Sequence, residues 1–514
     1  MLNLRSLFFS LSASLCTLCA GAQDTTKVHL ITYDEAIHIA LGESYTVKYY
    51  KEDMDATRYA YLFRKAQFKP LLDFGLFAPS WDEGMKEIQQ ADGLPVYNST
   101  GSLQVGGNLN FTYVLPTGGN LALSSRMYWE NYRTTLSELD NEKLERNQVY
   151  SRFALTFNQP IFTANKLKEN MRVAELDYKK STCYFTRIQM NIVYNVTESF
   201  YNVYKLAYEH KINQDRLANS REAYRITKLK QETGNLPEGE ILIAEITVAQ
   251  DEARVMESEG KLAAAKDQFK LLIGLNLKEE VDLKADMEFE AFLVDMQQAI
   301  DEAMRNRMEI QEDNLDIELQ AIEVKRAKRE REFKGNISAY YDFTGLSTNS
   351  TGTVGALVGS SFNNMMDRPS NRGIALTVSY PIYDWGRAKN QVRREQVRMK
   401  QRELDLDNTR RTIEREIREI VRSVYEAEKR YRLNRRNQEV ALQSYRISQM
   451  RFENGDMTSQ ELSIEQERLS QVQLAYIDSY ITYRLSVADL NRKTMYDFEN
   501  QHSFIKEVDL TSNK

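Results

Sequence analysis

The stretch "SYPIYDWGRAKNQ" at residues 379–391 joins a strand-like run to a very long segment without helix breakers. Residues 374–379 alternate apolar with small or polar side chains, as a β-strand with two different faces does. Residues 387–454 contain neither glycine nor proline, which predicts one continuous helix. Pro381 suits the end of a strand, because proline cannot donate a hydrogen bond to a neighbouring strand. The sequence therefore predicts a strand-to-helix junction at this point.

The same arrangement occurs a second time, as "NQPIFTANKLKEN" at residues 158–170. When the sequence is aligned with itself so that Pro160 meets Pro381, Gly234 meets Gly455. This single register holds without gaps over about a hundred residues, which indicates an internal duplication. Each copy is expected to contain a helix, strands, a very long helix, a tight turn and a returning helix.

The two long helices are expected at 161–233 and 387–454, since neither range contains glycine or proline. At about 1.5 Å per residue, such a helix reaches roughly 100 Å. It must bury an apolar stripe, and the spacing of the stripes fits antiparallel, coiled-coil-like packing against returning helices at about 240–272 and 460–496. The stripes are Ile188, Ile192, Val196, Ser199, Val203 and Leu206, and Ile413, Ile417, Ile420, Val424 and Ala427.

Alternating runs predict six short strands, at 72–76, 105–113, 121–129, 153–158, 337–344 and 374–379. The second and third flank the turn "PTGG" and form a hairpin expected in the first copy only. The alternation fits a transmembrane β-barrel and a soluble sandwich equally well. An export signal favours the barrel. Four to six strands cannot enclose a water-filled barrel, so the chain is expected to oligomerise.

The N-terminus has the pattern of an export signal at residues 1–22. Arg5 precedes a mostly apolar segment, and "AGA" at 20–22 has the small-x-small form of a cleavage site, so we expect cleavage before Gln23. A buried N-terminal helix is the alternative. Lipidation of Cys16 or Cys19 stays open, although neither follows a convincing lipobox. We find no later apolar run of about 18 residues and therefore expect no transmembrane helix.

The composition excludes several classes of function. The 68 basic and 74 acidic residues give a net charge of −6, which argues against nucleic acid as a partner. Four histidines and three cysteines leave little material for a metal site, and we predict no metal and no cofactor. Phosphate-binding loops, zinc spacings and nucleophile elbows are not recognisable, so we do not expect an enzyme.

At the two junctions and the turns that follow, the sequence resembles the TolC-like outer-membrane efflux protein family. That family repeats a "Q-P-(L/I)-F" element followed by "D/N-x-G", which here correspond to residues 159–162 and 380–386. Its aromatic-x-x-Gly turn corresponds to residues 452–455, and its opening helix to residues 33–41. The first copy has "TAN" at 163–165 where a glycine turn is expected, so we expect its bend to differ.

The resemblance implies a mainly α-helical chain with a membrane β-barrel portion. Two structural repeats of strands and very long antiparallel coiled-coil helices would form a trimeric β-barrel, continued by an α-helical periplasmic tunnel. The implied function is a homotrimeric outer-membrane channel that receives cargo from an inner-membrane pump through a periplasmic adaptor. The alternative is a structural coiled-coil scaffold of the periplasm without channel activity. The sequence leaves the cargo and the pump class open.

The resemblance also implies roles for the two tips. The tip residues expected to contact the adaptor are Gly234, Asn235, Leu236, Gly455, Asp456 and Met457. Glu240 and Glu461 lie six residues beyond the tip glycines, at positions where the family places the acidic residues of its constriction. Acidic rings at a pore mouth select for cations. A solvated glutamate on a charged helix is the simpler interpretation of each.

The junction residues have an expected role in the membrane. Aromatic side chains are enriched at membrane–water interfaces, and glycine permits a sharp bend. The residues expected at the barrel-to-tunnel junction are Pro160, Phe162, Pro381, Tyr383, Trp385 and Gly386. We expect the first repeat at 23–293, the second at 294–500 and a C-terminal tail at 501–514.

Overall fold

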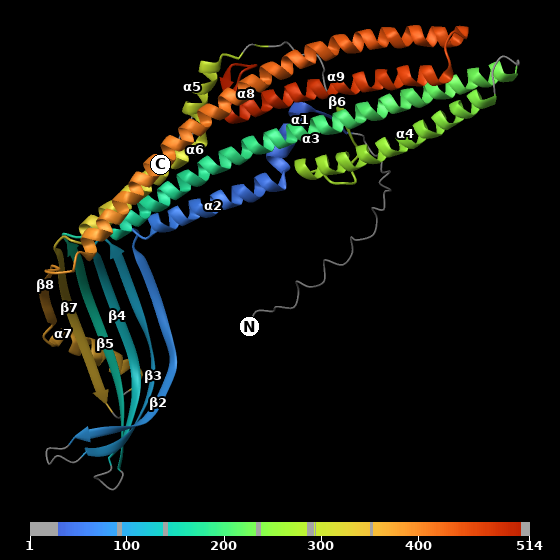
Figure 1. Ribbon diagram of the computed structural model, residues 1–514. Helices are drawn as coiled ribbons and strands as arrows, with labels where there is room; N and C mark the ends of the chain where they lie inside the picture. The colour runs from blue at the N-terminus through green and yellow to red at the C-terminus, as the bar shows by residue number, and fades with distance from the viewer. Residues whose placement is uncertain are drawn as a thin grey trace, which may run out of the picture. The chain divides into compact units, whose positions relative to one another are not determined.

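The computed structural model describes residues 29–89, 95–136, 142–232, 238–284, 292, 294–349 and 353–504 (Figure 1). The expected signal segment and most of the expected tail lie outside the described residues. The chain divides into two compact units. The first, called the helical unit here, comprises Met1–Lys48, Asn191–Leu293 and Ile420–Arg492. The second, called the sheet unit, comprises Tyr49–Met190, Val294–Glu419 and Lys493–Lys514.

Two very long helices dominate the chain, as the sequence predicts. Helix α3 spans Lys166–Glu232 and α8 spans Arg387–Asn454, with 67 and 68 residues. The returning helices α4, Glu238–Ile273, and α9, Ser459–Thr494, have 36 residues each. The start of α8 corresponds to that of α3, and the start of α9 to that of α4, in the register that aligns Pro160 with Pro381. The duplication seen in the sequence is therefore also present in the structure.

The elements before each sheet repeat in a different register. The first copy begins with β1 (His29–Thr32), α1 (Tyr33–Glu43) and α2 (Tyr45–Ala66). The short strand β6 (Val281–Lys284) follows α4, and the second copy then opens with α5 (Met296–Asn306) and α6 (Met308–Arg329). Helices α1 and α2 are separated from α5 and α6 by the same offset, which is larger than the offset between the long helices. The first copy therefore holds extra residues between its opening helices and its long helix.

Those extra residues lie in the sheet. Six antiparallel strands pair in the order β2-β3-β4-β5-β7-β8, four from the first copy and two from the second. Their bounds are Leu71–Gln89, Pro95–Val114, Asn120–Leu136, Glu142–Ile161, Lys334–Asn349 and Asn371–Ser379. All six predicted strands are present, including the extra hairpin around "PTGG". Most are much longer than predicted, because pairing continues beyond the stretch in which apolar and polar residues alternate.

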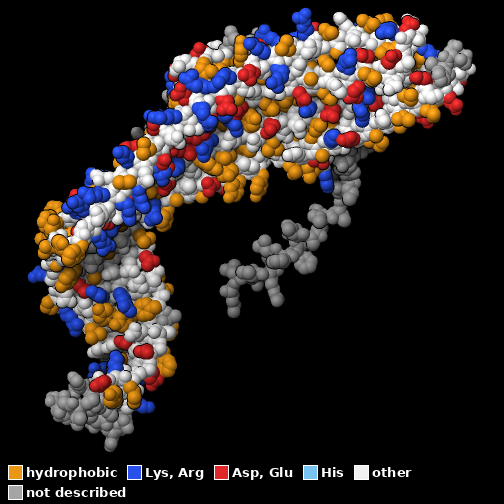
Figure 2. All heavy atoms as spheres, in the orientation of Figure 1, with side chains coloured by type: hydrophobic (Ala, Val, Ile, Leu, Met, Phe, Trp, Pro, Cys, Tyr) orange, Lys and Arg blue, Asp and Glu red, His pale blue; other side chains and the backbone are white. Residues whose placement is uncertain are grey.

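The register of the sheet separates its side chains into two faces. One row across five strands consists of Leu72, Phe111, Leu123, Leu155 and Tyr341. We call this side the apolar face. The opposite side, the polar face, carries Gln104, Glu130 and Gln148, which are hydrogen-bonded in a row. Many residues of the apolar face are exposed in the single chain, and Figure 2 shows hydrophobic side chains over the strands and where the strands meet the helices.

One helix of the sheet unit was not anticipated from the sequence. Helix α7, Val354–Asp367, follows β7 and packs against β7 and β5. Two short strands, β9 (Tyr496–Asp497) and β10 (His502–Ser503), pair after α9. Among the residues that the structure describes, no helix is both long and apolar enough to cross a membrane.

The predicted apolar stripes are buried. In α3, Ile192, Val196 and Val203 are nearly inaccessible to solvent, and all five residues of the α8 stripe are buried. Ile188, Ser199 and Leu206 are half-buried. In the helical unit, the rings of Tyr33, Phe200, Tyr201, Phe269 and Tyr480 extend this packing across α1, α3, α4 and α9. The core of the helical unit is thus formed by the inner sides of its helices.

Candidate functional site: hairpin tips and strand-to-helix junctions

Asp384 fixes the second junction, between β8 and α8. Its Oδ1 accepts a hydrogen bond from the backbone N–H of Gly386 and its Oδ2 accepts one from Ala388, both at 2.9 Å. These N–H donors hold the pKa of the Asp384 carboxyl below its usual value. Trp385 and Gly386 adopt the left-handed φ values of 53° and 80°. The left-handed region suits glycine but is sterically strained for tryptophan, so the Asp384 hydrogen bonds help to hold this turn.

Aromatic side chains surround this junction. Trp385 is 86% exposed, and its ring meets that of Tyr383 edge to face with centroids 4.7 Å apart. Phe333, just before β7, stacks on Tyr380 at 4.4 Å. Such exposure is unusual for large apolar residues in water and is typical of an aromatic girdle at a membrane surface.

The first junction has the different bend expected from its sequence. Phe162 alone adopts a left-handed φ there, of 60°. Asn165 is the N-cap of α3, because its Oδ1 accepts a hydrogen bond from the Lys168 backbone N–H at 3.0 Å. Its Nδ2 donates to the Pro116 carbonyl at 2.9 Å, in the turn between β3 and β4. One asparagine thus caps the long helix and anchors the extra hairpin.

The second tip reverses the chain with two standard motifs. Gly455, with φ 91°, ends α8 in a Schellman motif. In that motif the Asp456 N–H donates to the Arg451 carbonyl at 2.8 Å, and the Gly455 N–H donates to the Phe452 carbonyl at 3.1 Å. Thr458 and Glu461 then form a capping box at the start of α9. The Glu461 carboxylate accepts hydrogen bonds from the N–H and hydroxyl of Thr458, which lowers its pKa.

The capping box gives Glu461 a structural role in addition to the expected one at the gate. The signal was present, because "TSQE" at 458–461 fits the Thr-x-x-Glu pattern at a helix start. Glu461 is exposed, and Glu240 is half-buried in the first turn of α4. Both expected gate residues therefore occupy the first turn of a returning helix, where the helix dipole favours a carboxylate.

The second tip is tied to α3 within the helical unit. Lys230 Nζ, near the end of α3, donates to the Phe452 and Glu453 carbonyls at 2.7 and 3.2 Å. It also lies 5.1 Å from the centroid of the Phe452 ring. Phe452 packs in a cluster with Tyr445 and Leu462, and Met457 is partly buried against it. Asp456 and Gly455 stay exposed, whereas Gly234, Asn235 and Leu236 lie outside the described residues.

A buried ionic network joins three helices farther from the tips. Arg216 of α3 contacts Asp251 of α4 through Nε at 2.7 Å and contacts Glu467 of α9 through a second guanidinium nitrogen. Arg254 reaches the same Glu467 carboxylate at 3.0 Å. Arg216 and Asp251 are almost completely buried. Hydrogen bonding from Arg216 is the main cause that lowers the pKa of Glu467 to about 2.

No sequence motif marks this network, but a comparison of the two copies indicates it. In the register of the duplication, Arg216, Asp251 and Glu467 correspond to Asn437, Val472 and Ile246. Each of these three charged residues therefore corresponds to an uncharged residue in the other copy. A buried charge is costly unless it is paired, so three such departures from the repeat indicate a specific contact.

Known proteins resemble the chain over nearly all its length. The family model described as "Outer membrane efflux protein" matches residues 36–275 and 300–492. No curated protein matches the chain.

Three similar solved structures are distant from this chain in sequence. The CmeC outer membrane channel of Campylobacter jejuni superposes with a TM-score of 0.64 at 14% identity, over 90% of this chain and 85% of that one. The outer membrane protein VceC of Vibrio cholerae superposes with a TM-score of 0.59 at 15% identity, over 90% of this chain and 95% of that one. The MtrE outer membrane channel of Neisseria gonorrhoeae superposes with a TM-score of 0.60 at 12% identity, over 90% of this chain and 88% of that one. At these identities the likeness establishes the fold.

The Arg216 network predicts a loss of helical stability at acid pH. Because the pKa of Glu467 is lowered by folding, its contribution is complete above about pH 4.5 and is lost as the pH falls toward about 2. We expect the melting temperature, followed by circular dichroism, to fall less steeply over this range in Glu467→Gln than in the unchanged protein. Glu257→Gln, which removes an exposed pair with Lys261 within α4, should leave the slope nearly unchanged. Equal slopes in all three proteins would contradict the role of this network.

Proposed function

The chain belongs to the outer membrane efflux protein family and is an outer-membrane efflux channel, and we propose that it works as a homotrimer that meets a periplasmic adaptor and an inner-membrane pump at its tips. The family match favours the channel over the periplasmic scaffold that the sequence left as the alternative. The family consists of channels rather than enzymes. The observation that carries the trimer is a six-stranded sheet with one apolar face and two free edges.

Closure of the sheet supports an assembly of several copies. Strands β2 and β8 are the two edges of the sheet, and they run in opposite directions. The β8 edge of one copy can therefore pair antiparallel with the β2 edge of the next. Three copies of six strands make eighteen, a number that leaves an aqueous channel. The apolar face then meets lipid and the polar face lines the channel.

Helix α8 has an exposed apolar surface that a second copy could cover. In the helical unit, α8 exposes Leu433, Val440 and Ile447 at spacings of seven residues, and each is more than half exposed. A helix repeats its face about every seven residues, so these side chains form one stripe. The stripe lies outside the buried face of α8 and is therefore available to another copy.

The tips fit the role of a pore mouth. Three copies would bring together six carboxylates from Glu240 and Glu461, and such rings favour cations. Asp456 and Gly455 are exposed at the second tip and are available to an adaptor. We propose the same role for Gly234, Asn235 and Leu236, which lie outside the described residues. Met457 is partly committed to the tip cluster, so a contact through it would be limited to its exposed part.

Assembly is tested by Val440→Asp, which puts a charge into the α8 stripe. Burying an unpaired carboxylate between copies is costly, so we expect the trimer to dissociate to monomers in mild detergent. Light scattering after size-exclusion chromatography measures the mass. Gln449→Asp adds the same charge at an exposed polar position two and a half turns from Val440, on the other side of α8, and should leave the trimer intact. An unchanged trimer in Val440→Asp would argue against this stripe as the interface.

The gate is tested in planar bilayers. Glu461→Gln removes the charge but keeps a side chain that can complete the capping box. We expect it to lose about half of the cation preference, because one of two acidic rings is neutralised. The reversal potential in a salt gradient measures this, and Glu259→Gln, on an exposed part of α4, is the control. Glu461→Ala removes the cap as well and is expected to raise conductance. Unchanged selectivity in Glu461→Gln would exclude a ring at this position.

The adaptor contact is tested by placing a photo-crosslinking amino acid at Asp456 in cells. Asp456 is exposed directly after the tip glycine, so we expect an adduct that mass spectrometry identifies as a periplasmic adaptor protein. The same amino acid at Glu259 should give no such adduct. Reaction at Glu259 but not at Asp456 would place the adaptor on the side of the helices instead of the tips.

A further inference from the structure

Helix α7 lies on the apolar face of the sheet. The Ser361 hydroxyl of α7 is 2.8 Å from the Ser151 hydroxyl of β5. Ser151 pairs with Met127 on one side and Gly345 on the other, a row that belongs to the apolar face. A Cβ at Gly345 would come within 2.0 Å of the Ser361 carbonyl oxygen, so glycine permits the close approach. In an outer-membrane channel this helix is therefore outside the wall, on the lipid side.

The remaining surface of α7 has two unlike flanks. Leu357, Ser361 and Met365 are buried against the sheet. Val358, Phe362 and Met366 recur every four residues along one flank, and the last two are about half exposed. Ser360, Asn363 and Asp367 occupy the other flank and are exposed. A helix with one apolar and one polar flank is typical of the interface between lipid and water.

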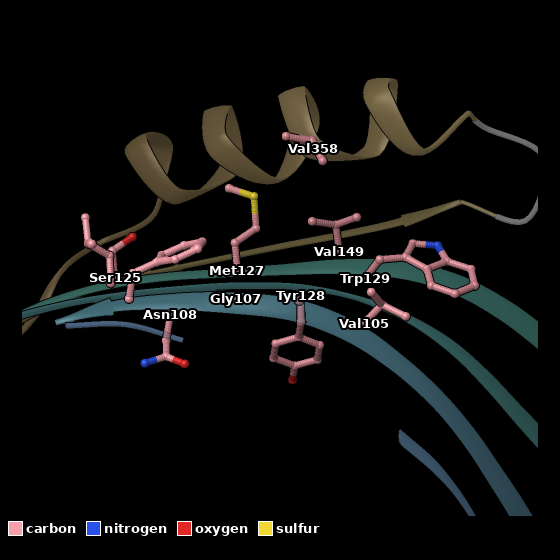
Figure 3. A pocket seen from close by; sticks show the side chains of 12 residues that line it. Val105, Gly107, Asn108, Ser125, Met127, Tyr128, Trp129, Val149 and Val358 are labelled. Carbon is pink, nitrogen blue, oxygen red and sulfur yellow. The ribbon is translucent and has the colours of Figure 1, made fainter. Parts of the chain in front are cut away.

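An apolar groove lies beside the apolar flank (Figure 3). It has a volume of about 390 Å³ and is lined mainly by Val105, Leu109, Met127, Trp129, Val149 and Val358. Val358 comes from α7, and the other five come from strands β3 to β5. The groove lies away from the free edge at β8, and Phe74 of the other edge strand, β2, completes its lining, so the whole lining belongs to one chain.

The groove lies at one end of the apolar band. On β4 the apolar face runs from Leu121 to Trp129, nine residues, which is the length that a strand needs to cross a membrane. Beyond Trp129 the same face carries Asn131 and Arg133. The groove begins near the middle of this band and ends at Trp129, in the half farther from the long helices. It therefore faces the leaflet on that side.

The rim of the groove holds a donor that lacks an acceptor. Trp129 Nε1 is buried, and within the described part of the chain it has no hydrogen-bond partner. Figure 3 shows the indole nitrogen directed to the side on which α7 lies. A buried donor normally has a partner. Protein atoms cover this nitrogen, so the groove presents an apolar surface at Trp129 and the indole ring contributes to its lining.

We propose that α7 is an interfacial helix and that the groove between α7 and β3–β5 binds an acyl chain of a lipid in the leaflet farther from the long helices. The apolar lining fits a hydrocarbon chain, and the polar flank of α7 remains in the headgroup layer. The site depends on the outer-membrane location of the channel and does not depend on the trimer, the gate or the adaptor.

The orientation of α7 is tested with nitroxide labels at Phe362→Cys and Ser360→Cys, each in a Cys183→Ser chain. The full-length protein is reconstituted into vesicles of phosphatidylethanolamine and phosphatidylglycerol. We expect the label at 362 to collide with oxygen and to be shielded from a water-soluble nickel complex, while the label at 360 collides with nickel. Nickel access at 362 would place this flank in water. Shielding from both reagents would mean that a second copy covers it. Either result overturns the proposal.

Occupancy of the groove is tested by fluorescence of Trp129 in a Trp81→Phe, Trp385→Phe chain. Vesicles of phosphatidylcholine brominated near the carbonyl end of the acyl chain should quench Trp129 strongly. Val358→Phe fills the groove and should at least halve this quenching. Ala356→Phe adds the same ring on the polar side of α7 and should leave it unchanged. Quenching that is absent, or equal in all three chains, would overturn the acyl-chain site.

Discussion

Burial of one apolar stripe along each long helix is the constraint on which the rest of the structure depends. Helical propensity alone does not hold 67 or 68 residues in a fixed place, because most helical stability in proteins comes from packing. The α8 stripe is buried over its whole predicted length, and the returning helices follow from the same need. The surfaces that remain, including the stripe at Val440, are then available for assembly.

The two copies share a scaffold and differ where the molecule makes specific contacts. The capping box at Thr458 and Glu461 and the anchor of Asn165 each occur in one copy, and the Arg216 network joins two residues of the first copy to Glu467 of the second. A duplicated chain contains two copies of the same arrangement of helices. Substitutions in one of them can then create a contact without disturbing the packing that both need.

The sequence predicted much of the fold, and the reasons for its limits are physical. The long helices follow from the absence of glycine and proline, and the six strands follow from alternation. Strand lengths were underestimated because backbone pairing continues where neither face is apolar, as in β2 beyond Trp81. Helix α7 was missed because Gly355, Gly359 and the two serines that follow have low helix propensity, so the segment gives a weak helical signal. Contacts between distant helices, such as Arg216 with Asp251, depend on tertiary packing that local patterns do not encode.

The extra hairpin separates two dimensions of the channel. A hairpin starts and ends on the same side of the membrane, so it adds two strands per chain without changing the number or direction of the helices. The number of strands in the sheet can therefore increase while the number of long helices stays the same. The added turn at Pro116 joins β3 directly to β4, whereas β5 and β8 each lead into a long helix. Asn165 holds that turn to the start of α3, so one side chain ties the added hairpin to the long helix of the same copy.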